Sequence, residues 1–180
     1  MAPTFAPRIA LQERHLPAAL RLSQALKWPY RLEDWRDALR LGHGFGAEVE
    51  GELRATALWW PWGEQFATCG MIIVDAALQG RGIGRALVCD LLEAAGTRTM
   101  LLKSTVAGQR LYEQLGFVAF GRVHQHQATL ATSPPEVDGT DAVTDLPGGA
   151  TSALLALDRA ASGMDRSRLL EALLAAGQFV

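Results

Sequence analysis

A glycine-rich heptapeptide is the part of this sequence best suited to chemistry. It runs from Gln79 to Arg85 as Gln-Gly-Arg-Gly-Ile-Gly-Arg, between an apolar run at 71–74 and a helical pattern that begins at Ala86. A strand, a glycine turn and a helix in that order place free backbone N–H groups and the positive end of the helix dipole beside the turn. Because glycine accepts positive φ and allows a close approach to a bulky anion, the heptapeptide predicts a diphosphate-binding turn.

The spacing of the glycines excludes two common phosphate-binding motifs. A P-loop needs Lys followed by Ser or Thr after its last glycine, and this chain has Arg85-Ala86 there. The dinucleotide spacing G-x-G-x-x-G fails from either Gly80 or Gly82. The spacing that fits is Q-x-x-G-x-G, formed by Gln79, Gly82 and Gly84. A turn that merely connects a strand to a helix is the alternative.

A second segment, 107–117, reads Ala-Gly-Gln-Arg-Leu-Tyr-Glu-Gln-Leu-Gly-Phe. Leu111 and Leu115 are four residues apart and share one helix face. Gly116 stands where a glycine ends a helix, and Phe117 then opens a predicted strand. Together the two segments resemble the acyl-coenzyme A loop and the A-x-x-L-Y-x-x-L-G-F segment of the GCN5-related N-acetyltransferases (GNAT family). The resemblance covers roughly residues 5–130.

This resemblance implies a mixed α/β fold with a GNAT-like sheet whose central strands splay apart around the cofactor. It implies transfer of an acetyl or small acyl group from acetyl-coenzyme A to an amine, by direct attack in a ternary complex. Backbone groups of the last sheet residues would pair with the pantetheine arm, and the glycine-turn amides would hold the pyrophosphate beside two arginines. The expected cofactor-binding residues are Ile72, Ile73, Val74, Gln79, Gly80, Arg81, Gly82, Ile83, Gly84, Arg85 and Thr105.

Two of these expectations have alternatives. Arg81 and Arg85 would serve equally as solvated arginines at a helix start. Many relatives carry an asparagine near Thr105 that meets the cofactor, and a hydroxyl replaces that contact only in part.

Tyr112 is the predicted catalytic residue. Attack of an amine on a thioester expels a thiolate, and a phenol whose ordinary pKa is about 10 is a suitable acid for it. A core tyrosine with a structural hydrogen bond is the alternative. The general base is left open among Glu48, Glu64 and Asp75, with Asp75 favoured as a turn residue. Cys69 is expected to be buried and structural.

Three aromatic residues, Trp28, Tyr30 and Trp35, surround a break between two predicted helices. In the family that region lines the acceptor pocket, so these residues are predicted to bind the acceptor. They would favour an aromatic or apolar amine over a polyanionic one. The alternative is that they cap the core.

Composition and charge fit a globular enzyme. The 180 residues are 49% hydrophobic with a net charge of −2, which gives no reason to expect nucleic acid as a partner. Two cysteines provide no disulfide framework, and no apolar run approaches the ~20 residues of a membrane span. A soluble, cytoplasmic protein is expected. No metal is expected, because His124 and His126 have no third ligand.

The element order is also predicted. Helices are expected at 16–26, 32–41, 84–95 and from 107; strands at 8–11, 45–49, 52–60, 65–74 and 99–103, with a turn at 61–64. Two further strands, 117–120 and 123–130, would close the sheet. Alternatively the last strand is missing, or it comes from the tail or from a second chain.

Three parts are expected along the chain: an acetyltransferase domain at 1–130, a linker at 131–150 rich in Pro and Gly, and a helical tail at 151–180. The tail resembles the opening helices of a second, truncated repeat, as in tandem GNAT proteins. Shared Leu/Ala composition is the alternative explanation. The apolar faces of the tail would pack on the first domain or on a partner chain, such as a second copy.

Two other functions remain open at this point. One is an acyl-coenzyme A binding or regulatory module without catalysis. The other is a structural partner built around the tail helices.

Overall fold

The computed structural model describes residues 8–126 and 149–177. The chain divides into two compact units, Met1–Phe117 and Val118–Val180.

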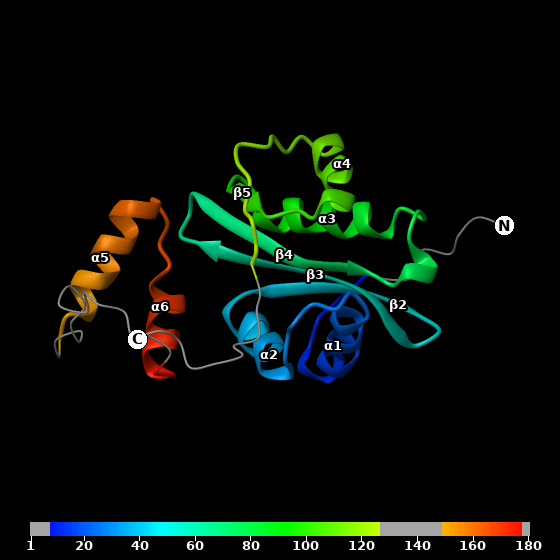
Figure 1. The fold of residues 1–180 in the computed structure, drawn as a ribbon, viewed down its shortest axis with the longest axis horizontal. Coiled ribbons are helices and arrows are strands. Elements are labelled where there is room, and N and C mark those ends of the chain that lie inside the picture. The colour runs from blue at the N-terminus through cyan, green and yellow to red at the C-terminus, as the bar shows by residue number, and fades with distance from the viewer. Residues whose placement is uncertain (1–7, 127–148, 178–180) are drawn as a thin grey trace. The chain divides into compact units, whose positions relative to one another are not determined.

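A five-stranded mixed sheet forms the centre of the first unit (Figure 1). Its strands lie in chain order: β1 (Arg8–Ala10), β2 (His43–Val49), β3 (Glu52–Trp62), β4 (Phe66–Val74) and β5 (Thr99–Leu102). β1 to β4 pair antiparallel, with short turns joining β2 to β3 and β3 to β4, whereas β5 pairs parallel to β4. A parallel neighbour requires a crossover, and α3 (Ile83–Ala95) supplies it. The predicted mixed α/β sheet is confirmed.

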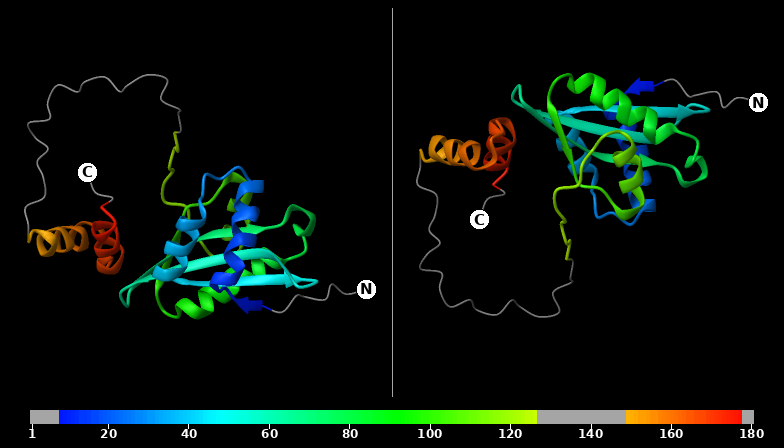
Figure 2. Two further views of the ribbon diagram at one scale, coloured as in Figure 1. Left: turned by 90° about the horizontal axis from the view of Figure 1, so that it is seen from below. Right: turned by 90° about the horizontal axis from the view of Figure 1, so that it is seen from above.

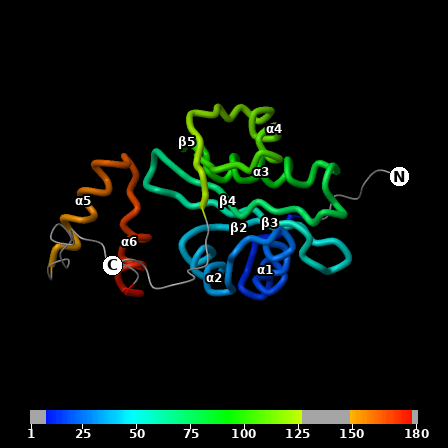
Figure 3. The backbone as a smooth tube through the Cα atoms, viewed as in Figure 1, coloured from blue at the N-terminus to red at the C-terminus, as the bar shows by residue number. Residues whose placement is uncertain are grey.

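Helices cover the two faces of this sheet (Figure 2). α1 (Leu16–Ala25) and α2 (Leu32–Leu41) lie on one face, and α3 lies on the other. Figure 3 follows the backbone from β4 through α3 to β5 and then to α4 (Val106–Gln114). Short 3-10 turns, η1 (Glu13–His15) and η2 (Ala76–Leu78), precede α1 and the glycine turn.

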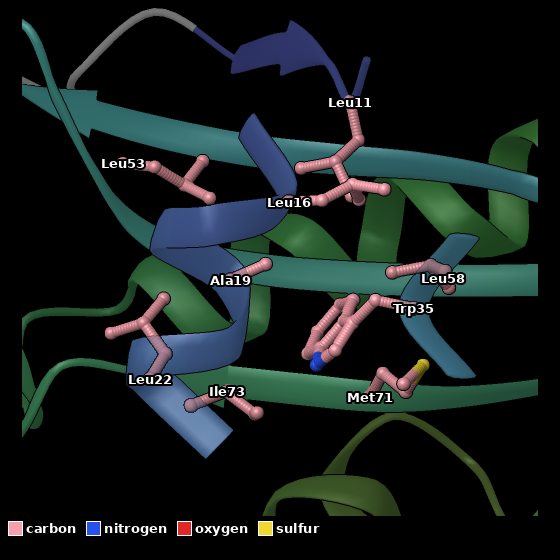
Figure 4. Packing of buried hydrophobic residues seen from close by; sticks show 9 residues of the cluster. All are labelled: Leu11, Leu16, Ala19, Leu22, Trp35, Leu53, Leu58, Met71 and Ile73. Carbon is pink, nitrogen blue, oxygen red and sulfur yellow. The ribbon is translucent and has the colours of Figure 1, made fainter. Parts of the chain in front are cut away.

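The core has two layers because side chains of a strand alternate between its faces. On the α1/α2 face, Leu16, Trp35, Leu58 and Met71 belong to one buried cluster (Figure 4). On the α3 face the second cluster contains small strand residues, Trp59 and Cys69, packed against the leucines of α3. The side chains of β4 therefore pack either on the face covered by α1 and α2 or on the face covered by α3.

The strand β3 is longer than the sequence indicates. A turn was predicted at 61–64, but β3 continues to Trp62. The Trp62 side chain is buried, and its indole Nε1 donates a hydrogen bond to Thr68 Oγ1 at 2.8 Å. Burial of this large side chain against β4 keeps the strand paired past Pro61.

The predicted strand at 117–120 is wrong. Residues 118–126 form no strand, and Val118 and Phe120 are 83% and 84% exposed. An apolar run forms a strand only where a partner satisfies its backbone groups, and no strand within the described residues pairs with it. His124 and His126 lie in the same irregular segment. Residues 127–130 of the other predicted strand lie outside the described residues.

The second unit contains the predicted helical tail. α5 (Thr151–Ser162) and α6 (Ser167–Ala175) form a helix pair in which Arg166 Nε lies 3.1 Å from Asp158 Oδ2. Neither helix has a buried residue. The boundaries predicted at 130 and 150 stay predictions. In the part of the chain that is described, no helix has the length and apolar character needed to cross a membrane.

Candidate active site

A gap opens between β4 and β5 halfway along the sheet. The two strands pair from Phe66 with Thr99 to Cys69 with Leu102, and β4 then continues beside β3 to Val74. Within the described residues, no strand pairs with Gly70–Val74 on the β5 side. Backbone groups there need partners. An extended ligand could supply them by lying along β4 as an added strand.

A β-bulge bends β4 where this gap begins. Leu58 pairs with Gly70 and Thr56 with Ile73, so β4 carries one residue more than β3 between these pairs. Met71 in the bulge has φ 50°, which is uncommon for a residue with a side chain. The fully buried Thr56 hydroxyl donates to the Met71 carbonyl at 2.8 Å. Thr56 therefore fixes the bulge, a role that sequence analysis missed.

The predicted cofactor strand offers its backbone rather than its side chains. Ile73 is 2% exposed and packs on the α1/α2 face, whereas Ile72 and Val74 pack toward α3. The main chain of these three residues borders the gap, and its pairing with a cofactor stays a prediction.

The glycine turn leads from β4 into the N-terminus of α3. Gly80 and Gly82 both have positive φ, 75° and 82°. Gly82 is the N-cap residue, and no side chain caps the helix. The first N–H groups of α3 therefore lack a side-chain partner and carry the positive end of the helix dipole. Gln79 braces the turn, because its Nε2 donates to the Val74 carbonyl at 3.1 Å.

Two arginines border this helix end. Arg81 and Arg85 are both exposed, and neither makes an ion pair in the part of the chain described. Gly84 lies against β4: a Cβ there would be 3.4 Å from the Val74 side chain. The turn, the helix end and the arginines together can hold a diphosphate through backbone amides and positive charge.

Tyr112 lies on α4 beside the last β4–β5 pair. Its ring packs edge-on against Phe117, with centroids 5.8 Å apart. Burial, together with the nearby Cys69 thiol, raises the pKa of Tyr112 to about 12. The phenol therefore stays protonated and can donate a hydrogen bond at any physiological pH. Cys69 is 5% exposed, and burial raises the pKa of its thiol to about 12 as well.

Thr105 is the N-cap of α4. Its Oγ1 accepts a hydrogen bond from the Gly108 N–H at 3.3 Å. The hydroxyl hydrogen remains available as a donor toward a ligand. Gly116 follows α4 with φ 89°, which confirms the predicted helix end.

A family comparison agrees with this geometry. Residues 40–119, which include the gap, the glycine turn and Tyr112, match the family model of the acetyltransferase (GNAT) domain. In these residues the chain is similar to a GNAT acetyltransferase domain.

A known protein resembles the chain in sequence, and solved structures resemble it in fold. The chain is 31% identical over 172 residues to an uncharacterized N-acetyltransferase, YitH, of Bacillus subtilis; the match covers 93% of this chain and 60% of that protein. The fold matches the ribosomal-protein-S18-alanine N-acetyltransferase of Escherichia coli with a TM-score of 0.56 and 28% identity, over 61% of this chain and 76% of that one. It also matches Rv2747 of Mycobacterium tuberculosis, solved with CoA and NLQ, with a TM-score of 0.55 and 18% identity, over 63% and 73%.

The predicted aromatic cluster in the first unit is only partly exposed. Tyr30 packs edge-on against Trp28 and Trp35, with centroids 6.0 Å and 6.3 Å apart. Trp35 has no exposed surface, and its Nε1 donates to Ser23 Oγ at 3.2 Å. Its truncation to alanine would cost about 3–5 kcal/mol of stability. Trp28 and Tyr30 keep the exposed surface that a ligand could touch.

The candidate bases have other roles in the domain. Asp75 accepts a hydrogen bond from the Ala77 N–H and pairs with Arg54 at 2.8 Å; these partners lower the pKa of Asp75. A carboxylate held in this way is a poor base. Glu48 lies 3.6 Å from His15 Nε2, and Glu64 is exposed in the β3–β4 turn, away from the gap. Among the described residues, no three metal-binding side chains lie together.

Proposed function

We propose that this chain transfers an acetyl or other small acyl group from acetyl-coenzyme A to an amine. The observation that carries the proposal is one continuous path: the side of Gly70–Val74 that faces away from β3, where no described strand pairs, leads through the glycine turn to the N-terminus of α3, which no side chain caps. A molecule with an extended amide arm at one end and a diphosphate at the other fits both parts. The chain covers only 60% of the length of its Bacillus relative. Acetyltransferase activity is therefore proposed for this chain from its own site.

Different parts of the site bind different parts of acetyl-coenzyme A. The β4 backbone holds the pantetheine arm, and the amides from Gly80 to Arg85 hold the pyrophosphate. Arg81 and Arg85 add positive charge, and the Thr105 hydroxyl donates to the cofactor. The thioester then lies near the β-bulge, beside Tyr112.

Tyr112 supports departure of the thiolate. The amine nitrogen attacks the thioester carbonyl, a C–N bond forms, the C–S bond breaks, and the amine loses a proton to solvent. The phenol, with a pKa raised to about 12, is a weaker acid than a thiol near 8.5. Tyr112 therefore acts chiefly by donating a hydrogen bond to the developing sulfur anion, and solvent completes the protonation.

An acyl-coenzyme A binding module without catalysis is the second candidate. The occupation of Asp75 by Arg54 and Ala77 favours it, because that carboxylate is the candidate base nearest the cofactor strand. Such a module would bind the cofactor but release no thiol when amines are added.

The relation of the helical tail to the first unit is a separate question. We infer that α5 and α6 correspond to α1 and α2 of a second acetyltransferase repeat. The support is the sequence likeness of Ala19–Ala25 to Leu154–Ala160 and the greater length of the Bacillus relative. The alternative is a helix pair that joins two copies of this chain.

Calorimetric titration with acetyl-coenzyme A and with coenzyme A tests the cofactor site. We expect micromolar dissociation constants for both. A thiol-release assay with a panel of small amines and peptides then separates the enzyme from the inactive module. If neither nucleotide binds, the glycine turn is only a connection and the proposal fails.

A further inference from the structure

The Trp60 side chain marks the start of the gap on the face opposite Tyr112. Trp60 packs against the α1/α2 cluster, whereas Cys69, which neighbours Tyr112, belongs to the α3 cluster. A Cβ added at Gly70 would lie 3.4 Å from Trp60 Cζ3. Gly70 is the first β4 residue beyond the last β4–β5 pair. The indole ring therefore covers the backbone at which β4 loses its neighbour.

This indole is held in one orientation. Trp60 Nε1 donates a hydrogen bond to the Ala38 carbonyl of α2 at 2.8 Å. At Gly42, an added Cβ would lie 2.4 Å from both Trp60 Cδ1 and the Trp59 carbonyl oxygen. Any larger residue at position 42 would displace the ring. The side chain nevertheless remains only half-buried. A fixed aromatic ring that keeps part of its surface exposed is suited to hold a ligand.

The two faces of the sheet separate the two substrates. The glycine turn and Tyr112 lie with α3 and α4, so the acyl donor takes the gap from that side. The amine must reach the same carbonyl carbon from the other side, where Trp60 lies. This step rests on the proposed function.

We propose that Trp60 forms one wall of the acceptor site and selects primary amines with a flat, apolar body, such as arylalkylamines. The amine group would reach the thioester while the aromatic body stacks on the indole. Stacking and burial on a fixed indole favour such an amine by about tenfold over a compact polar amine.

Nuclear magnetic resonance of the five tryptophan indole N–H groups tests the wall directly. The ¹⁵N-labelled chain is titrated with 2-phenylethylamine or with ethanolamine, in the presence and absence of coenzyme A. Trp60→Phe identifies the Trp60 signal by its loss, and Trp62→Phe does the same for a buried tryptophan on the same strand. We expect 2-phenylethylamine to shift the Trp60 signal and ethanolamine to leave it in place. An unmoved Trp60 signal, or equal shifts with both amines, would overturn the proposal.

Steady-state kinetics then separates the wall from the chemistry. Trp60→Leu is expected to raise the KM for 2-phenylethylamine about tenfold, with kcat, the ethanolamine rate and acetyl-coenzyme A affinity within about twofold of the parent. Trp60→Phe should recover most of the loss. Equal losses for both amines would overturn the selective role. If no amine is acetylated, the proposed function fails, and the Trp60 signal alone decides whether the wall binds arylalkylamines.

Discussion

At the scale of single residues, the protonation states of Tyr112 and Cys69 decide what each side chain can do in the site. Tyr112 and Cys69 lie near each other, and burial raises the pKa of both groups to about 12. Neither group is an anion at neutral pH, so neither repels an incoming acyl donor. The phenol can donate a hydrogen bond, while the buried thiol is inert as a nucleophile.

Tyr112→Phe is expected to lower kcat about a hundredfold, because one preorganised hydrogen-bond donor to the leaving sulfur is lost. Acetyl-coenzyme A affinity, measured by calorimetry, should stay within about twofold. Phe120→Leu, at an exposed aromatic residue outside the named site, is the control and should retain the parent kcat. Equal rates in Tyr112→Phe and the parent would contradict the role of Tyr112.

The pH dependence provides a second check on the same phenol. A tyrosine loses its proton as pH rises through its pKa, so an ordinary phenol would begin to lose activity near pH ~10. With the pKa raised to about 12, the parent rate should show no decline from this group up to pH 10. A descending limb that is present in the parent and absent in Tyr112→Phe would show that the phenol titrates earlier.

Thiol reactivity tests the burial of Cys69. Cys89 is exposed on α3, and Cys69 is buried. In the native chain a disulfide reagent should modify one thiol quickly, and Cys89→Ser should remove that reaction. Cys69 should react only after unfolding. Two fast thiols in the native chain would place Cys69 at the surface.

At the scale of elements, the junction between β4 and α3 controls the site. The glycine turn needs positive φ at Gly80 and Gly82, and the bulge needs the Thr56 hydroxyl on the Met71 carbonyl. The first requirement is local in sequence. The second arises only when β3 and β4 pair.

Gly82→Asp is expected to abolish coenzyme A binding, because it adds bulk and negative charge where the diphosphate lies and strains the backbone at φ 82°. Gly51→Asp is the matched control: Gly51 has φ 77° in the β2–β3 turn, and a Cβ there meets nothing within 4 Å. Calorimetry should show parent affinity for Gly51→Asp. Micromolar binding by Gly82→Asp would contradict the assignment of the turn.

The same distinction between local and cross-strand requirements explains which parts of the structure the sequence predicted. The glycine turn, α4 with Tyr112 and the end of α4 at Gly116 depend on local patterns, and they lie where predicted. Thr56 and Trp60 were missed because their roles depend on neighbours across strands, at Met71 and Gly70. Residues 117–120 were predicted as a strand from their apolar pattern alone, which says nothing about whether a partner strand exists.

At the scale of the whole molecule, the named residues of the candidate site, from Trp28 to Tyr112, all belong to the first unit, which ends at Phe117. The site and the tail are therefore separable by experiment.

A chain that ends after residue 148 is expected to bind coenzyme A within about twofold of the full chain, because every predicted contact is retained. Calorimetry on both chains measures this, and circular dichroism confirms that the shorter chain is folded. A loss of binding in a folded shorter chain would assign α5 and α6 a part in the site.

The division of the sheet into two faces also bears on how such a protein can change over generations. In the proposed function, the acyl donor is recognised largely through main-chain amides, which most side-chain substitutions leave in place. The acceptor side includes the exchangeable side chains of Trp28, Tyr30 and Trp60. Mutations can therefore alter which amine is used while the acyl donor stays the same, so duplicated copies of this gene could diverge in substrate without first losing activity.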